Sequence, residues 1–349
     1  MTSKDFDKKR LQDLADNITK DQELLKDYED SLREEREPSL RKKYSRTIKE
    51  LGESIAKHKQ EYAELKEKEW GNRMARISDN QPISSPIHQA SPEHPPLLFD
   101  LLLQIDFKQQ FRLVKTVIDK HQTIGFLVHG ELDCGQQMLV NRLYRVKSTW
   151  QHHKPIAIDV SSNGVGSNLG KLWGRVAGCV GLERDAEHSL ILKRICDRLK
   201  TQDVIFIFSK VELMLYTKTL IPWLEEFWQP LVRMTKTIEY FKETHLLMFL
   251  VDNCGKVCQS EVTLAEEFEA LNYDPCLPLR LPPASAFTLE MLEDWFELAI
   301  GFGGLTIPAG LTAQVLYEKS ERGIPQYVVE TICKHCGSSW EGGLAKWLI

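Results

Sequence analysis

Four short apolar runs, separated by helical patterns, constrain the fold of this chain more than any other feature. The runs are TIGFLVH at 123–129, PIAIDV at 155–160, DVIFIFS at 203–209 and HLLMFLV at 245–251. They are continuous rather than alternating, which is typical of strands buried on both faces of a parallel sheet. The segments with helical spacing between them are 135–144, 169–180, 186–200 and 220–235. We therefore expect a three-layer α/β core over residues 97–285.

Further elements are expected on both sides of this core. Residues 97–105 and 110–119 have helical patterns before the first strand, and 277–281 is a short fifth strand. A helix capped by Thr288 should run to Ile300. Two more helices, near 309–320 and 325–336, should complete a helical, winged-helix-like tail.

Residues 1–76 differ in composition from the rest, because nearly half of them are charged and the signs almost balance. Their apolar residues recur at alternating spacings of three and four, as at the a and d positions of a coiled coil. Pro38 is poorly placed inside a helix and well placed near the start of one. We expect two helices, near 4–36 and 38–70, folded back as an antiparallel hairpin.

The hairpin is interpreted as an interaction module. The apolar seam of its second helix contains Ile48, Leu51, Ile55, Tyr62 and Leu65. One such seam buries little area, so it should need a third helix or a second chain. A mere spacer is the alternative.

A linker separates this hairpin from the body of the chain. Residues 77–96 hold five prolines and four serines without a sustained pattern. We therefore divide the chain into a hairpin at 1–76, a flexible linker at 77–96 and an NTPase-like domain at 97–349.

The first strand of the core leads into a candidate phosphate-binding loop. Gly130 and Gly135 have the G-x-x-x-x-G spacing of a Walker A loop, between a strand and a helix. In an active loop a lysine and a serine or threonine follow the second glycine, to contact phosphate and Mg²⁺. Here those positions hold Gln136 and Gln137, and neither carries a charge. A different doubly wound fold with an accidental glycine pair is the alternative.

The third strand also lacks the acid that an active site would need. Such a strand should end in a carboxylate that orients Mg²⁺ and the attacking water, but this one ends in Ser209 and Lys210. Glu212 follows two residues later. The fourth strand does end in polar residues, Asp252 and Asn253, as such folds require. We therefore predict no catalytic residues.

We predict no metal site. Cys333 and Cys336 form a C-x-x-C pair with His335 between them, but no second pair follows at zinc-finger spacing. A helix end capped by Gly337 explains the motif.

Several stretches of the body resemble the inactive STAND domains of bacterial conflict and signalling systems. They are LLLQIDFKQQ, GFLVHGELDCGQQMLVNRL, DVIFIFSKVE, HLLMFLVDN and GIPQYVVETICKHCGSSWEGGLAKWL. The hairpin is similar to a helical effector-associated domain of the same systems. This resemblance implies a P-loop NTPase-like fold and an adaptor that joins an effector to a scaffold, with the effector bound through the hairpin.

The expected function is therefore a non-enzymatic adaptor without a cofactor, with weak ATP or GTP binding left open. A weak nucleotide-binding switch or residual NTPase is the alternative. Expected partners are a protein effector or a like hairpin, with homo-oligomers possible. The net charge of −5 gives no reason to expect nucleic acid. The N-terminus lacks the h-region of a signal peptide and no apolar run could cross a membrane, so we expect a cytoplasmic protein.

Overall fold

In the computed structural model of the chain, the described residues fall into two groups. The first is 95–349 without 153, 237–243, 269–272, 302–306, 309, 341–342 and 349. The second is 10, 40, 44–51, 54, 57 and 61. The chain divides into two compact units, residues 1–87 and 88–349, and each is described by itself.

The second unit is built around a five-stranded parallel sheet. Its strands are β1 (Thr123–Val128), β2 (Ile156–Asp159), β3 (Val204–Ser209), β4 (Leu246–Val251) and β5 (Leu279–Arg280). They lie in the order β2-β3-β4-β1-β5, and every neighbouring pair is parallel. Phe126 lies opposite Phe249 in the β1–β4 register. The α/β fold class is thus confirmed.

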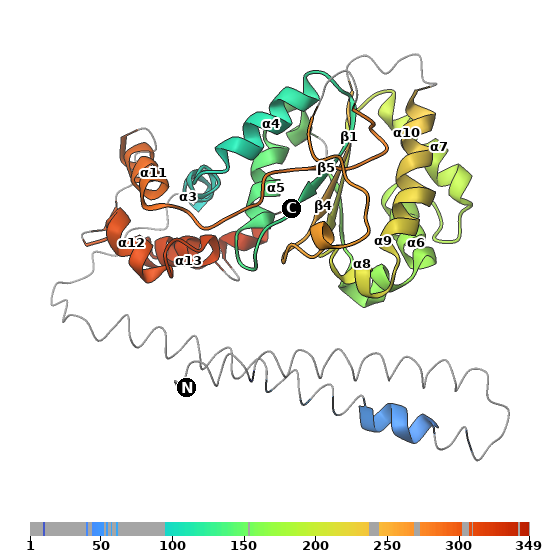
Figure 1. The fold of residues 1–349 in the computed structure, drawn as a ribbon, viewed down its shortest axis with the longest axis horizontal. Coiled ribbons are helices and arrows are strands. Elements are labelled where there is room, and N and C mark those ends of the chain that lie inside the picture. The colour runs from blue at the N-terminus through green and yellow to red at the C-terminus, as the bar shows by residue number, and fades with distance from the viewer. Residues whose placement is uncertain are drawn as a thin grey trace. The chain divides into compact units, whose positions relative to one another are not determined.

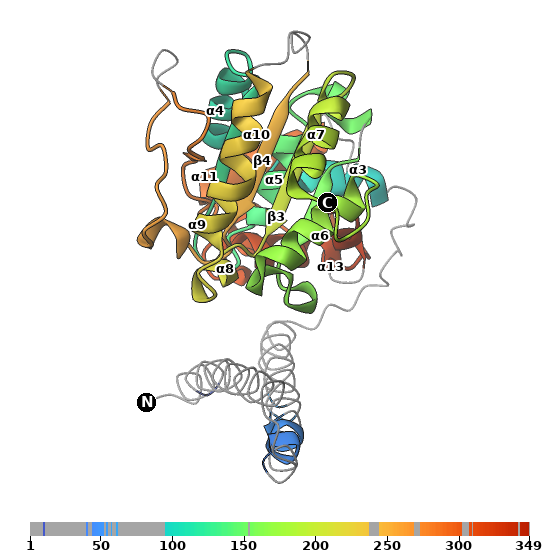
Figure 2. The ribbon, with the colours of Figure 1, turned by 90° about the vertical axis from the view of Figure 1, so that its right-hand side faces the viewer.

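Helices cover both faces of the sheet (Figures 1 and 2). They are α3 (Pro95–Leu102), α4 (Lys108–Ile118), α5 (Gln136–Tyr144), α6 (Leu169–Cys179), α7 (His188–Leu199), α8 (Leu213–Tyr216), α9 (Leu220–Trp223), α10 (Gln229–Thr235), α11 (Leu289–Gly301), α12 (Ala313–Lys319) and α13 (Pro325–His335). Short 3-10 turns are η1 (Ser148–His152), η2 (Ser162–Ser167), η4 (Val257–Gln259) and η5 (Leu344–Trp347), and η3 (Leu224–Trp228) is a π-turn.

The apolar core consists of two clusters, one on each face. Phe126 and Phe249 point to the face covered by α3, α4, α5 and α11–α13. Phe206 and Met248 point to the opposite face, which α6, α7, α9 and α10 cover. Successive strand residues therefore enter different clusters, which is why the strands are apolar without interruption.

Two predicted elements differ from the structure. The fifth strand is shorter than 277–281, because Pro278 and Pro282 flank it and proline cannot donate to a strand ladder. The helix expected at 220–235 contains the π-turn η3. Pro230 follows that turn and has no N–H for the carbonyl of Glu226, which removes one α-helical hydrogen bond.

The tail after Ala284 is helical, and its described residues include no strand. The Thr288 hydroxyl accepts a hydrogen bond from the Met291 N–H and caps α11, as predicted. At the end of α13, Gly337 has a φ of +67° and the Ser338 N–H donates to the Cys333 carbonyl at 2.8 Å. This is the glycine C-cap geometry expected for the C-x-x-C segment. No group of three metal-ligating side chains occurs among the described residues.

In the first unit, residues 44–51 are helical, and Ile48 and Leu51 are half-buried. The Arg10 guanidinium donates to the Glu61 carboxylate, with Nη2 at 2.7 Å from Oε1. The other seam residues, Ile55, Tyr62 and Leu65, lie outside the described residues. The hairpin and the domain limits at 76 and 96 stay predictions.

None of the helices that the structure describes has both the length and the apolar character needed to cross a bilayer.

Truncation of a core aromatic should destabilise the body. Phe206 is fully buried, and its ring meets the ring of Phe227 edge-on at a centroid distance of 5.2 Å. We expect Phe206→Ala to lower the free energy of unfolding by about 3–5 kcal/mol, measured by urea unfolding with tryptophan fluorescence. The control Leu190→Ala changes a side chain that is 47% exposed, and it should cost less than about 1 kcal/mol. Equal losses in the two variants would contradict the assignment of the core.

Candidate functional site

The candidate site lies where the strands end at their carboxyl termini, called here the carboxyl edge of the sheet. The loop 130–135 leaves β1 at this edge and leads directly into α5. The order of the strands places β1 between β4 and β5, so the loop starts beside the end of β4. In open α/β sheets, ligands bind at this edge where the strand order reverses.

The two predicted loop glycines are both required by packing. A Cβ on Gly130 would lie 2.3 Å from the carbonyl oxygen of Ala284, which pairs with this glycine as an isolated bridge. Gly135 has a φ of +78°, where side chains are strained, and a Cβ there would lie 3.0 Å from Pro325. The loop is therefore shaped by two segments that follow the sheet in the sequence.

The tail helix α13 begins against this loop. The Gln326 N–H, in the first turn of α13, donates to the Asp133 carbonyl at 3.1 Å. Asp133 itself has a φ of +64°. A backbone hydrogen bond from the tail thus holds the loop in a conformation that most residues avoid.

Gln136, at the position of the Walker lysine, turns back into the loop. Its side chain is buried, and Nε2 donates to the carbonyl of Glu131 at 2.7 Å and to that of Asn253 at 3.4 Å. An active lysine would instead extend toward the β- and γ-phosphates. Here the side chain joins the loop to the end of β4.

Gln137 and Ser209, the two positions expected to organise Mg²⁺, contact each other. The Ser209 hydroxyl donates to Oε1 of Gln137 at 3.4 Å. A neutral amide and a hydroxyl are poor replacements for a carboxylate beside a divalent cation. The structure therefore brings the predicted residues together without creating a Mg²⁺ ligand set.

Lys210 does not point toward the loop glycines. Its ammonium group donates to Oδ2 of Asp159 at 2.9 Å and to the Ser161 hydroxyl at 3.0 Å. Burial works to raise the pKa of Asp159, but the hydrogen bonds from Ser161 and Lys210 outweigh it and lower that pKa. This lysine is thus held at the end of β2 by its own ion pair.

Buried acids occupy the end of β4. Asp252 is fully buried and accepts hydrogen bonds from the N–H groups of Cys254 and Val257. Glu212 accepts from the Asn253 N–H at 3.2 Å. Burial raises the pKa of Glu212, and the nearby Asp252 adds to the rise.

The thiols beside the loop are partly or fully buried and lie near carboxylates. Burial, with smaller contributions from the carboxylates of Glu131 and Asp133, raises the pKa of Cys134 to about 11. Cys254 is likewise raised to about 11, by burial and by Asp252 and Glu212. Carboxylates beside the loop oppose the approach of a phosphate group, because the two charges have the same sign.

Sequence reasoning missed two contributors to this site. Ala284 and the start of α13 approach the loop from distant parts of the chain, and no local pattern marks those contacts. The sequence placed Glu212 only beyond the third strand. In the structure its carboxylate lies at the carboxyl edge of the sheet, where it accepts from the Asn253 N–H. An acidic residue between the apolar residues Val211, Leu213 and Met214 was the one sequence signal that could have indicated this position.

A comparison with known protein families matches the central part of the chain. Residues 102–251 match the family model described as inactive STAND. The match covers β1 to β4 together with the loop and the helices between them. No curated protein matches the chain.

Replacing the buried acid should stabilise the body at neutral pH. The raised pKa means that the folded state holds the Glu212 proton more tightly than the unfolded state. The contribution of Glu212 to the free energy of unfolding is therefore fully present below the ordinary glutamate pKa. It is lost as the pH rises through the pKa of Glu212 in the folded state. Glu212→Gln keeps an acceptor for Asn253, and we expect its melting temperature to exceed that of the wild type at pH 7–8 and to converge with it near pH 4.

The matched control is Glu226→Gln, which neutralises an exposed glutamate of η3. Its melting temperature should follow the wild type across the same pH range. A Glu212→Gln protein less stable than the wild type at pH 8 would contradict the burial cost assigned to this carboxylate.

Proposed function

We propose that this protein, whose residues 102–251 form an inactive STAND domain, is a non-enzymatic adaptor in a prokaryotic signalling or defence system. Its N-terminal hairpin would bind an effector or a second hairpin, and the body would act as the scaffold. The family match supports the degenerate NTPase-like body, and the resemblance of the hairpin to effector-associated domains supports the rest.

The observation that carries the proposal is the state of the loop. Gln136 is hydrogen-bonded into the loop and Gln137 is paired with Ser209, so the two positions that should meet phosphate and Mg²⁺ contact protein instead. Losing a charged contact to phosphate removes roughly 1.5–3 kcal/mol of charge-assisted hydrogen bonding. That corresponds to one to two decades of affinity.

The ion pair in the first unit supports an antiparallel hairpin. Arg10 would lie near the start of the first predicted helix and Glu61 near the end of the second, and they are 2.7 Å apart. Two helices running in opposite directions bring such positions together. The two side chains are 48% and 35% exposed, so the pair contributes little to stability.

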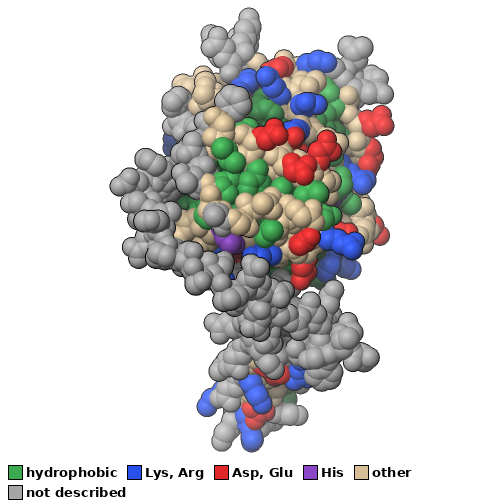
Figure 3. Space-filling model, turned by 90° about the vertical axis from the view of Figure 1, so that its left-hand side faces the viewer, with side chains coloured by type: hydrophobic (Ala, Val, Ile, Leu, Met, Phe, Trp, Pro, Cys, Tyr) green, Lys and Arg blue, Asp and Glu red, His purple; other side chains and the backbone are tan. Residues whose placement is uncertain are grey.

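Nucleic acid is not among the proposed partners. Acidic and basic side chains lie interspersed on the face drawn in Figure 3, with apolar side chains between them. The described side chains of this face therefore do not form the continuous basic stripe that nucleic-acid binding requires.

The alternative is a weak nucleotide-binding switch. It is favoured by one feature, the strand, glycine loop and helix N-terminus that still occur in the order used for phosphate binding. The neutral glutamines and the acids around the loop weigh against it.

Nucleotide binding decides between these two functions. We expect isothermal titration calorimetry of the full chain with ATP or GTP, with and without Mg²⁺, to detect no magnesium-dependent binding in the micromolar range. The double variant Gln136→Lys with Gln137→Thr restores the lysine and the hydroxyl, and it should bind ATP roughly tenfold or more tightly than the wild type does. Micromolar, magnesium-dependent binding or turnover by the wild type would overturn the adaptor-only function.

Association through the hairpin can be tested on its described seam residues. We expect residues 1–76 to self-associate or to bind a like hairpin, and Leu51→Asp to abolish that association by placing a charge in the seam. The melting temperature of the body should not change. Sedimentation velocity measures the association, and Ser45→Asp is the control because it adds the same charge at an exposed position. A monomeric hairpin, together with a 97–349 fragment that still associates, would refute the assignment.

A further inference from the structure

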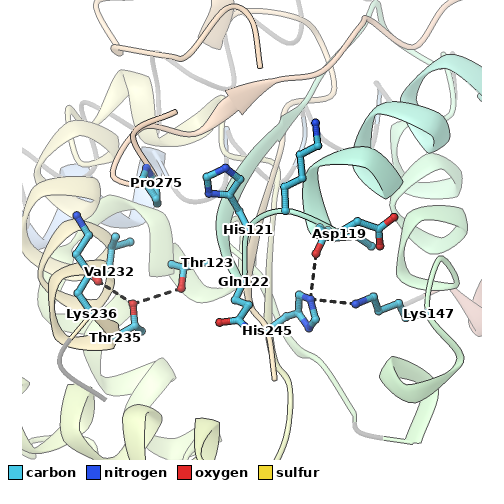
Figure 4. A pocket seen from close by; sticks show the side chains of 12 residues that line it. Asp119, His121, Gln122, Thr123, Lys147, Val232, Thr235, Lys236, His245 and Pro275 are labelled. Atoms are coloured by element: carbon cyan, nitrogen blue, oxygen red, sulfur yellow. Dashed lines mark hydrogen bonds between the residues drawn. The ribbon is translucent and has the colours of Figure 1, made fainter. Parts of the chain in front are cut away.

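A pocket of about 570 Å³ lies at the amino edge of the sheet, where the strands begin. The end of α4, the start of β1 and the end of α10 surround it (Figure 4). It is therefore at the opposite end of β1 from the loop 130–135. Its volume is within the range of small-molecule sites, which span roughly 300–1,000 Å³.

A chain of polar side chains forms one wall of this pocket. The buried Asp203 carboxylate accepts from the backbone N–H of His245 at 2.7 Å and lies 3.1 Å from Nδ1 of the same residue. With Nδ1 donating to Asp203, Nε2 of His245 lies 3.1 Å from the ammonium of Lys147 and 3.3 Å from the carbonyl oxygen of Ile118. Figure 4 shows the Lys147 side chain reaching this ring at the pocket wall.

Lys147 is thereby positioned beside the His245 ring, and the Asp203 carboxylate behind that ring balances only part of the lysine charge. A histidine nitrogen can accept one of the three ammonium protons, and it carries no negative charge when it does so. Asp203, which lies behind the ring, is already engaged by His245; burial works to raise its pKa, but the hydrogen bonds from His245 outweigh burial and lower it. The lysine is thus a fixed cation with donor capacity left for a ligand.

Donors dominate the rest of the lining. Lys120, Lys147 and Lys236 contribute three ammonium groups, while Asp119 contributes the one carboxylate among the lining residues. His121 adds an imidazole, whose ring packs edge-on against Tyr273 at a centroid distance of 5.3 Å. Such a set is complementary to a ligand rich in acceptors.

Two helix ends reduce the positive character without cancelling it. α4 and α10 both finish at this edge, and each helix carries about half a negative elementary charge at its C-terminus. Lys120 and Lys236, which follow those helices, each carry a whole positive charge, so a net positive charge of about one half remains at each helix end. Lys147 is fixed instead by the side chain of His245, so its charge remains available inside the pocket.

We propose that this pocket binds a small oxyanion, a molecule that carries a phosphate or a carboxylate group, with Lys147 as the contact that His245 positions and Lys236, on the opposite side of the pocket, as the second. The site is separate from the degenerate phosphate loop. Binding here does not depend on what residues 1–76 contact, so it can be tested apart from the adaptor function.

The test is calorimetry on the full chain with pyrophosphate, inorganic phosphate and citrate, at constant ionic strength. We expect one of these probes to bind in a one-to-one complex. Tighter binding of pyrophosphate or phosphate than of citrate would identify a phosphorylated ligand, and the reverse order a polycarboxylate. Failure of all three probes to bind in the millimolar range would overturn the proposal.

Variants locate the bound probe. Lys147→Gln and Lys236→Gln should each weaken binding by roughly tenfold or more, because each removes a charge-assisted contact. The control Lys193→Gln removes the same charge from an exposed position on α7 and should leave affinity unchanged. Equal weakening in all three variants would mean non-specific attraction and would refute the site.

Melting temperatures guard against misfolding. If Lys147→Gln does not fold, the affinity of the Lys236→Gln variant decides. Lys236 is exposed, and its loss disturbs no hydrogen bond of the Asp203–His245 pair. Unchanged affinity in a folded Lys236→Gln protein would then overturn the proposal.

Discussion

The pairing of β1 with β4 along six consecutive positions is the constraint from which the rest of the body follows. Every residue of both strands is buried, so helices must cover both faces of the sheet. Because β3 pairs with the other side of β4, the ends of three strands converge at one edge. A loop that leaves β1 is placed at that edge whatever side chains it carries.

This placement explains how a loop can keep the glycine spacing of a phosphate loop without the lysine and hydroxyl that usually follow the second glycine. Gly130 is held by its approach to Ala284, and Gly135 by its left-handed backbone and by Pro325. Both glycines are therefore needed for packing, independently of any ligand. Side chains that serve phosphate or Mg²⁺ alone have no such support, and at those positions Gln136 and Gln137 form hydrogen bonds within the protein. A glycine spacing alone is thus weak grounds for assigning nucleotide binding.

The sequence was sufficient for elements whose causes are local. Continuous apolar runs identified β1 to β4, and Thr288 and Gly337 identified the ends of two helices. Contacts between distant segments could not be predicted, since nothing near Asp133 indicates Gln326 and nothing near Lys147 indicates His245. β5 is short because Pro278 and Pro282 cannot donate to a strand ladder, and the apolar character of residues 277–281 alone predicts a longer strand. The site residues Ser209 and Lys210 were correctly placed at the end of β3, but their partners Gln137 and Asp159 emerge only from the folded sheet.

The backbone hydrogen bond from Gln326 to Asp133 joins the first βα-turn of the sheet to the last long helix of the chain. During synthesis, β1 leaves the ribosome well before α13 exists, so the turn has no partner while the sheet assembles. Long-range contacts of this kind close late and slow the completion of folding. The turn at Asp133 therefore lacks its α13 partner until residues 325–335 have been synthesised, and during that period it is open to chaperones or to misfolding.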